Sequence, residues 1–509
     1  MIEKISYSVY EQGEDRGAVF KSTDLENTGN KEGSGKGKSP KEKVSRNFFL
    51  VLYPNRCRTV KRNLGALSHC FTQYAQTGDG VLFPIAFFVE CKGWEEERIS
   101  LGIIVQKFGG SSIATIERIK KVALLVEEEV KRNQKVVVVV SAMGDTTEEL
   151  LQLAHQLSMD PSRREMDMLL STGEVISMAL LAITLNDRGM KAISLTGWQA
   201  GIQTEKVFGQ ARIVGIDTTK ICQELDQGKV VIVAGFQGIT KDGEITTLGR
   251  GGSDITAVAL AASLKAERCD IYTDVPGVFS SDPRFVPEAR QLSTLSYDEM
   301  LEMSNLGATV LHPRAVEFAK NYFIPLTVKS SFEQKPGSWI TGETLMEDHL
   351  IVRGVTFEKD VAKITLFGLN NGASSLSSIF SPLAWHHINV DIIIQSTTRA
   401  GKTNISFSVK SKDLKDTLLV LEREKEAISY ESLEWEPHLA KVSIIGSGMV
   451  SNPGVAAKMF ENLWKENIDI KMVTTSEIKV SAVVKEQDVV RAARILHKTF
   501  ELGKVPPIG

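Results

Sequence analysis

The sequence has little cysteine and no pattern of a secretory leader. Its five cysteines are spread over 509 residues, and none stands in CxxC or CxxxC spacing. Such usage provides neither a disulfide framework nor a zinc site, and it is typical of a reducing compartment. The first ten residues are mixed polar, and the apolar run Val81–Val89 contains Pro84 and is too short to cross a bilayer. We therefore expect a cytoplasmic protein.

The sequence also lacks a strong net charge. Lys and Arg number 60 against 63 Asp and Glu, which leaves a formal charge of -3. No basic field is present to attract nucleic acid or an anionic membrane, and we expect neither among the partners. Hydrophobic residues at 42% and charged residues at 24% are ordinary for a globular protein. At about 150 residues per domain, the length predicts about three domains.

The first hundred residues differ in composition from the rest. They hold three of the five cysteines and carry 15 Lys and Arg against 13 Asp and Glu, whereas the other 409 residues carry 45 against 50. Residues 29–43 have no apolar side chain, so burial cannot offset their chain entropy. Residues 1–100 are expected to be disordered or an extension ahead of the true start. Purine-rich codons for 92–97, resembling a ribosome-binding site, would then precede a non-Met start at Leu101.

A regular alternation of strands and helices begins at Leu101. The β-branched run 135–140 is typical of a strand buried on both faces, and 111–133 has the apolar spacing of an amphipathic helix. Further strands are predicted at 103–106, 191–195, 230–234, 269–273 and 326–329, and helices at 161–187, 254–266, 296–304 and 309–320. This order predicts a three-layer αβα fold with a mainly parallel sheet over 101–345.

Segments rich in glycine and hydroxyl groups stand beside these strands, where parallel sheets bind ligands. They are 107–112 (KFGGSS), 141–147 (SAMGDTT), 249–254 (GRGGSD) and 273–284 (TDVPGVFSSDPR). Glycine loops that open onto helix N-termini offer backbone N–H groups to anions. The sequence contains no GxxxxGK[ST] motif, and no GxGxxG lies between a strand and a helix, which excludes the two commonest nucleotide fingerprints.

These four segments, in this order, resemble the aspartokinases of the amino-acid kinase family. KFGGSS, SAMGDTT and GRGGSD are the most specific, and the likeness covers about 101–509, with Ser111 where the family often has Thr. The resemblance implies that ATP, with Mg²⁺, phosphorylates the β-carboxylate of L-aspartate to 4-phospho-L-aspartate. This is the first step toward lysine, diaminopimelate, threonine and methionine. The acceptor carboxylate is ionised at pH 7, so catalysis needs positioning and charge neutralisation rather than a base.

The resemblance and the residue chemistry together assign roles at the acceptor end. Lys107 is predicted to stabilise the transferring phosphoryl group, the alternative being a solvated lysine at a strand end. Arg250 suits the substrate α-carboxylate by its bidentate geometry. By resemblance, Glu174 suits the substrate ammonium group, with a solvent-facing helix position as the alternative, and Asp254 either caps a helix or acts near substrate and metal. The predicted catalytic residues are Lys107, Arg250 and Asp254, and the predicted substrate-binding residues are Thr147, Glu174, Arg250 and Ser253.

The nucleotide site is predicted from the same segments. Ser141 and Gly144 would line the phosphates, unless their segment only caps the next helix. The stretch 273–284 resembles the family's adenine-nucleotide wall, unless Asp282-Pro283 is a plain turn. Thr309 stands where some relatives have Lys, so the nucleotide contact assigned to that lysine is not expected in this chain. His312 is predicted to be structural. No metal ligand is assigned. The predicted ATP-binding residues are Lys107, Phe108, Gly109, Gly110, Ser141, Gly144, Thr273, Asp274, Ser281, Asp282 and Arg284.

Residues 362–436 and 441–505 repeat each other at an offset of 80, which matches Phe380 with Phe460 and Ser396 with Ser476. Each repeat reads as the ferredoxin-like order βαββαβ. The pair resembles tandem ACT domains, which sense amino acids, with predicted bounds 346–436 and 437–509. The resemblance places effectors between paired domains, although 452–454 is also compatible with an ordinary turn. The implied effector-binding residues are Asn371, Asn389, Asp391, Gln395, Asn452, Gly454 and Val455.

Regulation and assembly follow from the same resemblance. Lysine is the expected feedback effector, with threonine and diaminopimelate as alternatives. A second, shorter product starting at Met346 is expected, in a homo-oligomer or an α2β2 assembly. Two other functions compete with this one: a kinase for glutamate, acetylglutamate or a nucleoside monophosphate, and an amino-acid sensor with an inactive kinase region. Glu174 with Arg250 favours a free α-amino acid, and the intact Lys107 and Asp254 favour an active enzyme.

Overall fold

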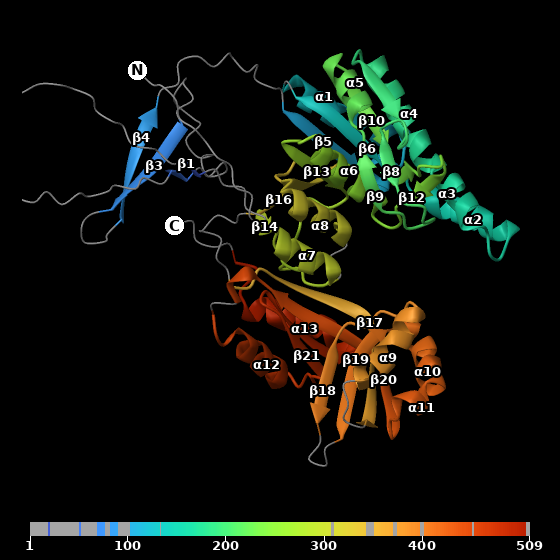
Figure 1. Ribbon diagram of the computed structural model, residues 1–509, viewed down its shortest axis with the longest axis vertical. Helices are drawn as coiled ribbons and strands as arrows, with labels where there is room; N and C mark the ends of the chain where they lie inside the picture. Colours follow the sequence, from blue (N-terminus) through green and yellow to red (C-terminus); the bar gives the residue numbers. More distant parts are fainter. Residues whose placement is uncertain are drawn as a thin grey trace, which may run out of the picture. The chain divides into compact units, whose positions relative to one another are not determined.

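The computed structural model describes most of the chain from residue 102 onward, together with four short strands before residue 90 (Figure 1). The described ranges are 102–132, 134–306, 310–342, 351–369, 374–397, 402–449 and 452–504. The chain forms two compact units, Met1–Ser100 and Leu101–Gly509.

In the first unit the structure describes two antiparallel strand pairs. The strands are β1 (Val19–Phe20) with β2 (Leu50–Val51), and β3 (His69–Gln76) with β4 (Leu82–Val89). The sequence shows no sustained period there and did not predict them. The rest of 1–100, and Leu101, lie outside the described residues. Disorder of this segment and a start at Leu101 therefore stay predictions.

An eight-stranded sheet forms the centre of residues 102–342. Its order is β14-β16-β15-β13-β5-β6-β10-β7, and every neighbouring pair is parallel except β15 with β16. The strands are β5 (Ile103–Phe108), β6 (Lys135–Val140), β7 (Ala192–Leu195), β10 (Val230–Ala234), β13 (Arg268–Thr273), β14 (Thr294–Ser296), β15 (Leu326–Ser330) and β16 (Ser338–Thr341).

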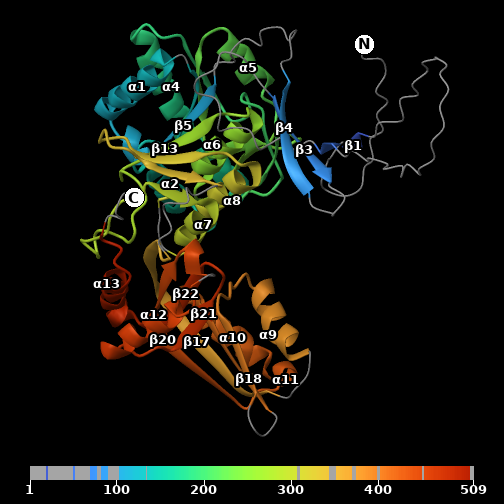
Figure 2. The same ribbon diagram turned by 90° about the vertical axis from the view of Figure 1, so that its left-hand side faces the viewer.

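Helices cover both faces of this sheet (Figure 2). Val136, Val138 and Val140 of β6 pack in one core with α1 (Ile116–Lys131) and α4 (Thr172–Asp187). The intervening Val137 and Val139 pack in the other core with the helices of the opposite layer. Those helices are α5 (Thr219–Asp226), α6 (Gly252–Ser263), α7 (Tyr297–Asn305) and α8 (Pro313–Tyr322). The predicted three-layer fold with a mainly parallel sheet is confirmed.

Two local features differ from the sequence prediction. The helix predicted over 161–187 is divided at Ser171 into α3 (Arg163–Leu170) and α4. A small sheet of order β12-β11-β8-β9 was not predicted, because strands of three or four residues are too short to show a period of two. Its strands are β8 (Ile202–Thr204), β9 (Ile213–Ile216), β11 (Gln237–Ile239) and β12 (Ile245–Thr247).

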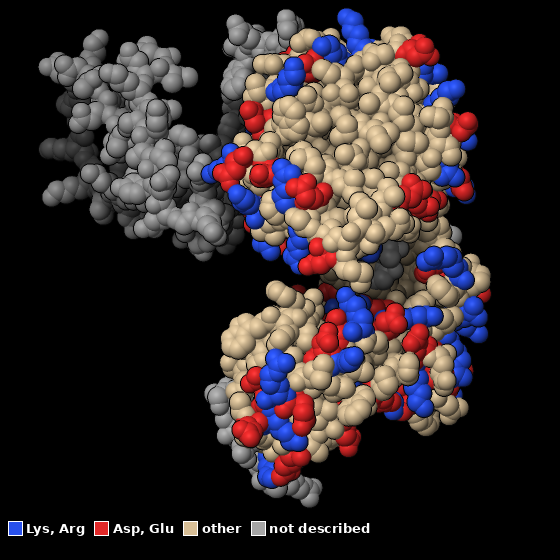
Figure 3. Space-filling model, turned by 90° about the vertical axis from the view of Figure 1, so that its right-hand side faces the viewer, with Lys and Arg blue, Asp and Glu red and all other residues tan. Residues whose placement is uncertain are grey.

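Apolar side chains remain exposed on two outer helices. Leu153 and Leu157 of α2 (Thr146–Leu157), and Ile176 and Ile183 of α4, are each at least half exposed. The face in Figure 3 is the side on which these helices lie, and its upper part is mostly uncharged with charges along its margin. Among the described residues, Arg163–Asp187 is the one helical stretch long and apolar enough to cross a membrane, and half of its most apolar window is buried in protein.

The C-terminal half of the second unit is one six-stranded antiparallel sheet of order β18-β19-β17-β20-β22-β21. Its strands are β17 (Gly354–Leu369), β18 (Ile393–Thr397), β19 (Thr403–Lys410), β20 (Ser432–Ile445), β21 (Met472–Thr475) and β22 (Lys479–Lys485). The helices are α9 (Ser374–Trp385), α10 (Leu414–Arg423), α11 (Lys425–Ile428), α12 (Val455–Lys465) and α13 (Val489–Thr499).

Two ferredoxin-like units share the long strands β17 and β20. The first uses the later part of β17 and the earlier part of β20, and the second uses the later part of β20. The fourth strand of the second unit is Gly354–Glu358, which pairs with 441–445. The repeat suggested a strand after α13, yet this strand comes from before the first unit. Left-handed residues mark both junctions, with φ of 62° at Asp360 and 58° at His438. The predicted pair of ferredoxin-like units is confirmed, and the exact domain bounds stay predictions.

Candidate active site

Two of the glycine segments touch at the ends of β5 and β6. The Gly144 N–H donates to the Gly110 carbonyl at 3.1 Å, and the Ser141 N–H donates to the Phe108 carbonyl at 3.1 Å. A Cβ atom on Gly110 would lie 2.8 Å from the Ala142 carbonyl oxygen, so a side chain there would push the loops apart. Glycine at position 110 is therefore required for this close approach of the two loop backbones.

Lys107 and Asp254 form an ion pair beside these loops. The Nζ–Oδ1 distance is 2.6 Å, and the two side chains are 12% and 11% exposed. Lys107 lies at the end of β5 and Asp254 in the first turn of α6, whose N-cap Gly251 provides no side-chain cap. Lys107 is thus not a solvated lysine, and Asp254 does not cap its helix. Their pairing holds an ammonium group at the edge where the loops meet.

Glu174 is a buried carboxylate next to the SAMG loop. It is 3% exposed, and its Oε1 accepts a hydrogen bond from the Ala142 N–H at 3.1 Å. Within the described part of the chain its Oε2 has no hydrogen-bond partner. Burial raises the pKa of Glu174 to about 7, and hydrogen bonds from the Glu174 and Ala142 backbone N–H groups, followed by the nearby Lys107 ammonium, oppose the shift only in part. A solvent-facing position for Glu174 is therefore wrong.

The break at Ser171 explains why this helix tolerates a glycine and a carboxylate. Because α4 begins at Thr172, Gly173 and Glu174 lie in its first turn, where a carboxylate interacts favourably with the helix dipole. A Cβ atom on Gly173 would lie 2.8 Å from the Ala142 Cβ, so glycine lets the helix start press against the SAMG loop. The helix break and the packing together bring Glu174 to the loops.

The other predicted acceptor-end residues lie on the same segments. Arg250 is exposed between two left-handed glycines, Gly249 with φ of 77° and Gly251 with φ of 69°. Thr147 is half-buried in the first turn of α2. Ser253 is buried against Gly235, where a Cβ atom would lie 2.8 Å from the serine side chain.

The predicted nucleotide residues divide into two groups. Gly109 donates from its N–H to the Tyr272 carbonyl at 3.2 Å, which joins the KFGG loop to the end of β13 and so to Thr273. The Thr273 hydroxyl donates to Asp274 Oδ1 at 3.0 Å. The Phe108 ring is buried and stacks on Tyr272 at 4.6 Å between centroids, so only its backbone remains for a ligand.

The second group is the turn Ser281–Arg284. Arg284 donates from its backbone N–H and its guanidinium to Asp282, at 2.9 and 2.7 Å, and this lowers the pKa of that carboxyl. Ser281 is buried, whereas the Arg284 side chain is 77% exposed. The local bonds of Asp282 are those of a turn.

His312 has a structural place. It is the N-cap of α8, where its Nδ1 accepts from the Arg314 N–H at 3.3 Å. A Cβ atom on Gly251 would lie 2.3 Å from the His312 side chain, so this histidine packs directly on the GRGG loop. Burial lowers the pKa of His312. Thr309 lies outside the described residues.

Comparison with known proteins agrees with this geometry. The model of the Amino acid kinase family matches residues 102–330, and that of the ACT domain matches residues 442–500. An aspartokinase of Bacillus sp. (strain MGA3) is 62% identical over 403 residues, which cover 79% of this chain and 98% of that relative. The chain belongs to the aspartokinase family.

Solved aspartokinases have the same fold. E. coli aspartokinase III in complex with aspartate and ADP (R-state) matches with a TM-score of 0.67 and 28% identity over 78% of this chain and 99% of that one. The same enzyme in complex with lysine and aspartate (T-state) matches with a TM-score of 0.63 and 27% identity, with the same shares covered. The predicted family and enzyme class, a phosphotransferase with a carboxyl acceptor, are therefore confirmed.

The predicted effector residues of this aspartokinase chain lie at two places in the regulatory sheet. Asn389, Asp391 and Gln395 are exposed at or before the edge strand β18. At the other place, Asn452 Nδ2 donates to the Gly448 carbonyl at 2.8 Å, and Gly454, with φ of 100°, and Val455 begin α12. Asn371 lies outside the described residues.

Sequence reasoning missed the partner of Asp391. Lys441 of β20 is 6% exposed and forms ion pairs with Asp391 and with Glu358, the latter at 3.1 Å. These contacts join the loop before β18 to both long strands. A lysine inside the mostly apolar run LAKVSII was the available signal, because a buried charge requires a partner.

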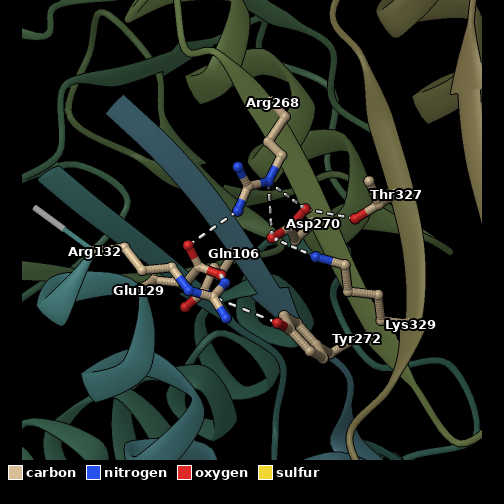
Figure 4. A network of polar contacts seen from close by, with 8 residues as sticks. All are labelled: Gln106, Glu129, Arg132, Arg268, Asp270, Tyr272, Thr327 and Lys329. Carbon is tan, nitrogen blue, oxygen red and sulfur yellow. Dashed lines mark hydrogen bonds and ion pairs between the residues drawn. The ribbon is translucent and has the colours of Figure 1, made fainter. Parts of the chain in front are cut away.

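A polar network on β13 was also missed (Figure 4). Asp270 is fully buried and contacts Arg268 at 3.1 Å, Lys329 at 3.0 Å and the Thr327 hydroxyl. Arg268 continues to Glu129 of α1 at 3.0 Å. The network fixes β13 against α1 and β15, and β13 carries Thr273 at its end. An aspartate within a buried strand was the sequence signal for it.

Proposed function

We propose that this chain transfers the γ-phosphoryl group of ATP to the β-carboxylate of L-aspartate, giving 4-phospho-L-aspartate and ADP. This is the first step toward lysine, diaminopimelate, threonine and methionine. The observation that carries the proposal is the shielded Lys107–Asp254 pair, with an Nζ–Oδ1 distance of 2.6 Å, where the glycine loops of this aspartokinase meet. The E. coli relative with aspartate and ADP supports the choice of ligands.

The main difficulty of this reaction is the repulsion between two anions, the substrate carboxylate and the polyphosphate. Charged residues of the site would reduce this repulsion. Lys107 supplies positive charge in a shielded place, where electrostatic interactions are stronger than in water. Glu174 would pair its free carboxylate oxygen with the substrate ammonium group, and Arg250 would hold the α-carboxylate. The β-carboxylate is already ionised and attacks without a base.

The loops and acids also fit a nucleotide with Mg²⁺. The KFGG and SAMG loops, held together by the close contact of Gly110 with Ala142, resemble glycine loops that receive phosphates. No group of three or more His, Cys, Asp or Glu side chains suited to a metal occurs in the part of the chain that was described. Mg²⁺ commonly uses one or two carboxylates plus phosphate oxygens, and Asp254 and Asp274 are the carboxylates that would serve. When bound, it would neutralise phosphate charge.

An ADP-release assay with several acceptors tests this function. With MgATP present, we expect turnover with L-aspartate and none above background with L-glutamate, N-acetylglutamate or a nucleoside monophosphate. The proposed Glu174-to-ammonium and Arg250-to-carboxylate contacts would select a free α-amino acid, and aspartate rather than glutamate is expected from the aspartokinase relatives. Turnover with another acceptor instead would contradict the proposal. No turnover with any acceptor, together with lysine binding, would favour a sensor with an inactive kinase region.

We further propose that lysine inhibits the enzyme through the six-stranded sheet. The E. coli relative in complex with lysine and the two ferredoxin-like units support this. Asp391 would bind the effector ammonium group, so Asp391→Ala should raise the half-inhibitory lysine concentration by about tenfold, the scale of a lost charge-assisted hydrogen bond. Asp416→Ala, on the exposed side of α10, is the control and should leave it unchanged. Inhibition by threonine alone would contradict lysine as effector.

A further inference from the structure

The segment 280–290 of the catalytic half packs into the core of the second ferredoxin-like unit. Val286 is 1% exposed and belongs to the same core as Val442 of β20 and Leu496 of α13. Phe285 meets Phe357 edge to face, with ring centroids 5.2 Å apart. A stretch that includes the end of the predicted nucleotide wall, 273–284, is therefore packed against the regulatory half.

Ser280 is the point at which this segment is held most closely. Its hydroxyl oxygen lies 3.0 Å from Nε2 of His497 in α13, and it accepts a hydrogen bond from the Arg290 N–H at 3.0 Å. Its carbonyl accepts from the Val355 N–H of β17 at 2.7 Å. Both β17 and α13 belong to the second ferredoxin-like unit, so Ser280 is bonded to it twice.

The Ser280 hydroxyl can hold both partners at once. Its oxygen accepts from the Arg290 N–H, and its proton and second lone pair remain for Nε2 of His497, which lies 3.0 Å away, whichever ring tautomer is present. His497 is 2% exposed, and burial lowers its pKa, which agrees with a neutral ring.

Two further hydrogen bonds fix the far side of the segment. Arg494 Nε of α13 donates to the Phe285 carbonyl at 2.7 Å, and Arg290 Nε donates to the Leu502 carbonyl at 2.9 Å. The turn 281–284 therefore lies between two anchors, Ser280 and Phe285, and both anchors are bonded to the second unit. Lys107, Glu174 and Arg250 lie on other segments and have no part in these bonds.

We propose that His497 is a positioning residue for the nucleotide site. By holding Ser280, it fixes the turn 281–284, so the second ferredoxin-like unit sets the apparent affinity for ATP and leaves that for aspartate unchanged. This inference rests on the proposed role of 281–284 in the nucleotide wall. It gives the regulatory half a direct physical connection to one substrate, in which the Ser280–His497 hydrogen bond is the buried side-chain contact.

Steady-state kinetics of full-length variants test the proposal. His497→Leu replaces the imidazole by an apolar side chain and so removes the hydrogen bond. This variant should raise KM for ATP about tenfold, while KM for aspartate stays within about twofold. His497→Gln places an amide near the Nε2 position and should restore most of the ATP affinity. Lys498→Leu, at the exposed neighbouring position of α13, is the matched control and should match the wild type.

Three outcomes would overturn the proposal: equal rises in both KM values, a fall in kcat alone, or a glutamine variant no better than the leucine variant. Should His497→Leu lose its fold by circular dichroism, Ser280→Ala removes the same bond from the other side and should give the same split. If the wild type lacks aspartokinase activity, the proposed function is wrong and the kinetics cannot be used. ADP binding measured by calorimetry then tests the role of His497 separately, and it is expected to weaken about tenfold in the leucine variant.

Discussion

At the scale of single residues, the candidate site depends on two shielded charged groups, Lys107 paired with Asp254 and Glu174 beside the SAMG loop. Lys107 between a buried strand and two glycines was predicted from the sequence, because the spacing itself is unusual. The burial of Glu174 was not predicted, since it depends on the break at Ser171 and on contact with Ala142. The Asp254 partnership with Lys107 likewise joins residues far apart in sequence, which no local pattern reveals.

The raised pKa of Glu174 leads to a prediction about pH. Burial raises this pKa to about 7, so the carboxyl group is neutral below pH 7 and ionised above it. Only the ionised form would bind the aspartate ammonium group. We therefore expect kcat/KM for aspartate to fall about tenfold from pH 8 to pH 6, because this ratio reports the free enzyme. Initial rates at limiting aspartate across that range measure it.

Two controls accompany this measurement. Glu174→Gln should have a low kcat/KM for aspartate that no longer changes between pH 6 and pH 8. Glu117→Gln, on the exposed first turn of α1, should keep the wild-type profile. A wild-type profile that is flat over this range would show that Glu174 does not bind the ammonium group in its ionised form.

At the scale of elements, the sequence predicted long and buried segments best. The bounds of β6 and β10 match the prediction because continuous β-branched runs occur where both faces are covered. The sequence did not predict the short strands β8, β9, β11 and β12, because they depend on tertiary pairing rather than on a local period. The network on β13 was not predicted for the same reason, since it joins side chains of three elements, β13, β15 and α1.

The β13 network should matter more for stability than a surface ion pair does. Asp270 is fully buried between the shielded cations Arg268 and Lys329, so Asp270→Ala removes the acceptor that they share and leaves Arg268 with Glu129 alone. We expect the free energy of unfolding of the catalytic half to fall by about 3 to 5 kcal/mol. Urea unfolding followed by circular dichroism measures the change.

The matched control is Asp226→Ala. Asp226 pairs with Lys135 at 2.7 Å, but its side chain is 70% exposed. Loss of such a pair should change the free energy of unfolding by less than about 1 kcal/mol. Equal effects of the two substitutions would mean that the β13 network contributes no more than surface charge.

At the scale of the whole molecule, the repeat was visible in the sequence but its strand exchange was not. Offset matches identify two similar units, yet they cannot show that Gly354–Glu358 completes the second unit from before the first. The insertion of Val286 into the regulatory core was equally hidden, because the stretch around it has no period. Both features join parts of the fold that lie apart along the chain, so domain bounds drawn along the sequence separate them.

The strand exchange bears on the predicted short product. Met346 lies outside the described residues, and a start there remains a prediction. A chain from Met346 would include 354–358 and so contain all strands of both ferredoxin-like units. We expect an antibody to the C-terminus to detect this product beside the full chain. Replacing Met346 by a codon that does not initiate should abolish it, whereas Met159→Leu should not. Persistence of the short band would contradict the internal start.

The most direct test of the proposed reaction is to trap its acyl phosphate. With MgATP, L-aspartate and hydroxylamine, the wild type should form aspartyl hydroxamate, because an acyl phosphate reacts with this nucleophile. Lys107→Ala should reduce the rate by about 100- to 1000-fold, the scale of one lost charge-stabilising group. Lys131→Ala, whose side chain is 71% exposed, should leave it unchanged. Hydroxamate formed by Lys107→Ala at the wild-type rate, or none formed by the wild type, would contradict the account.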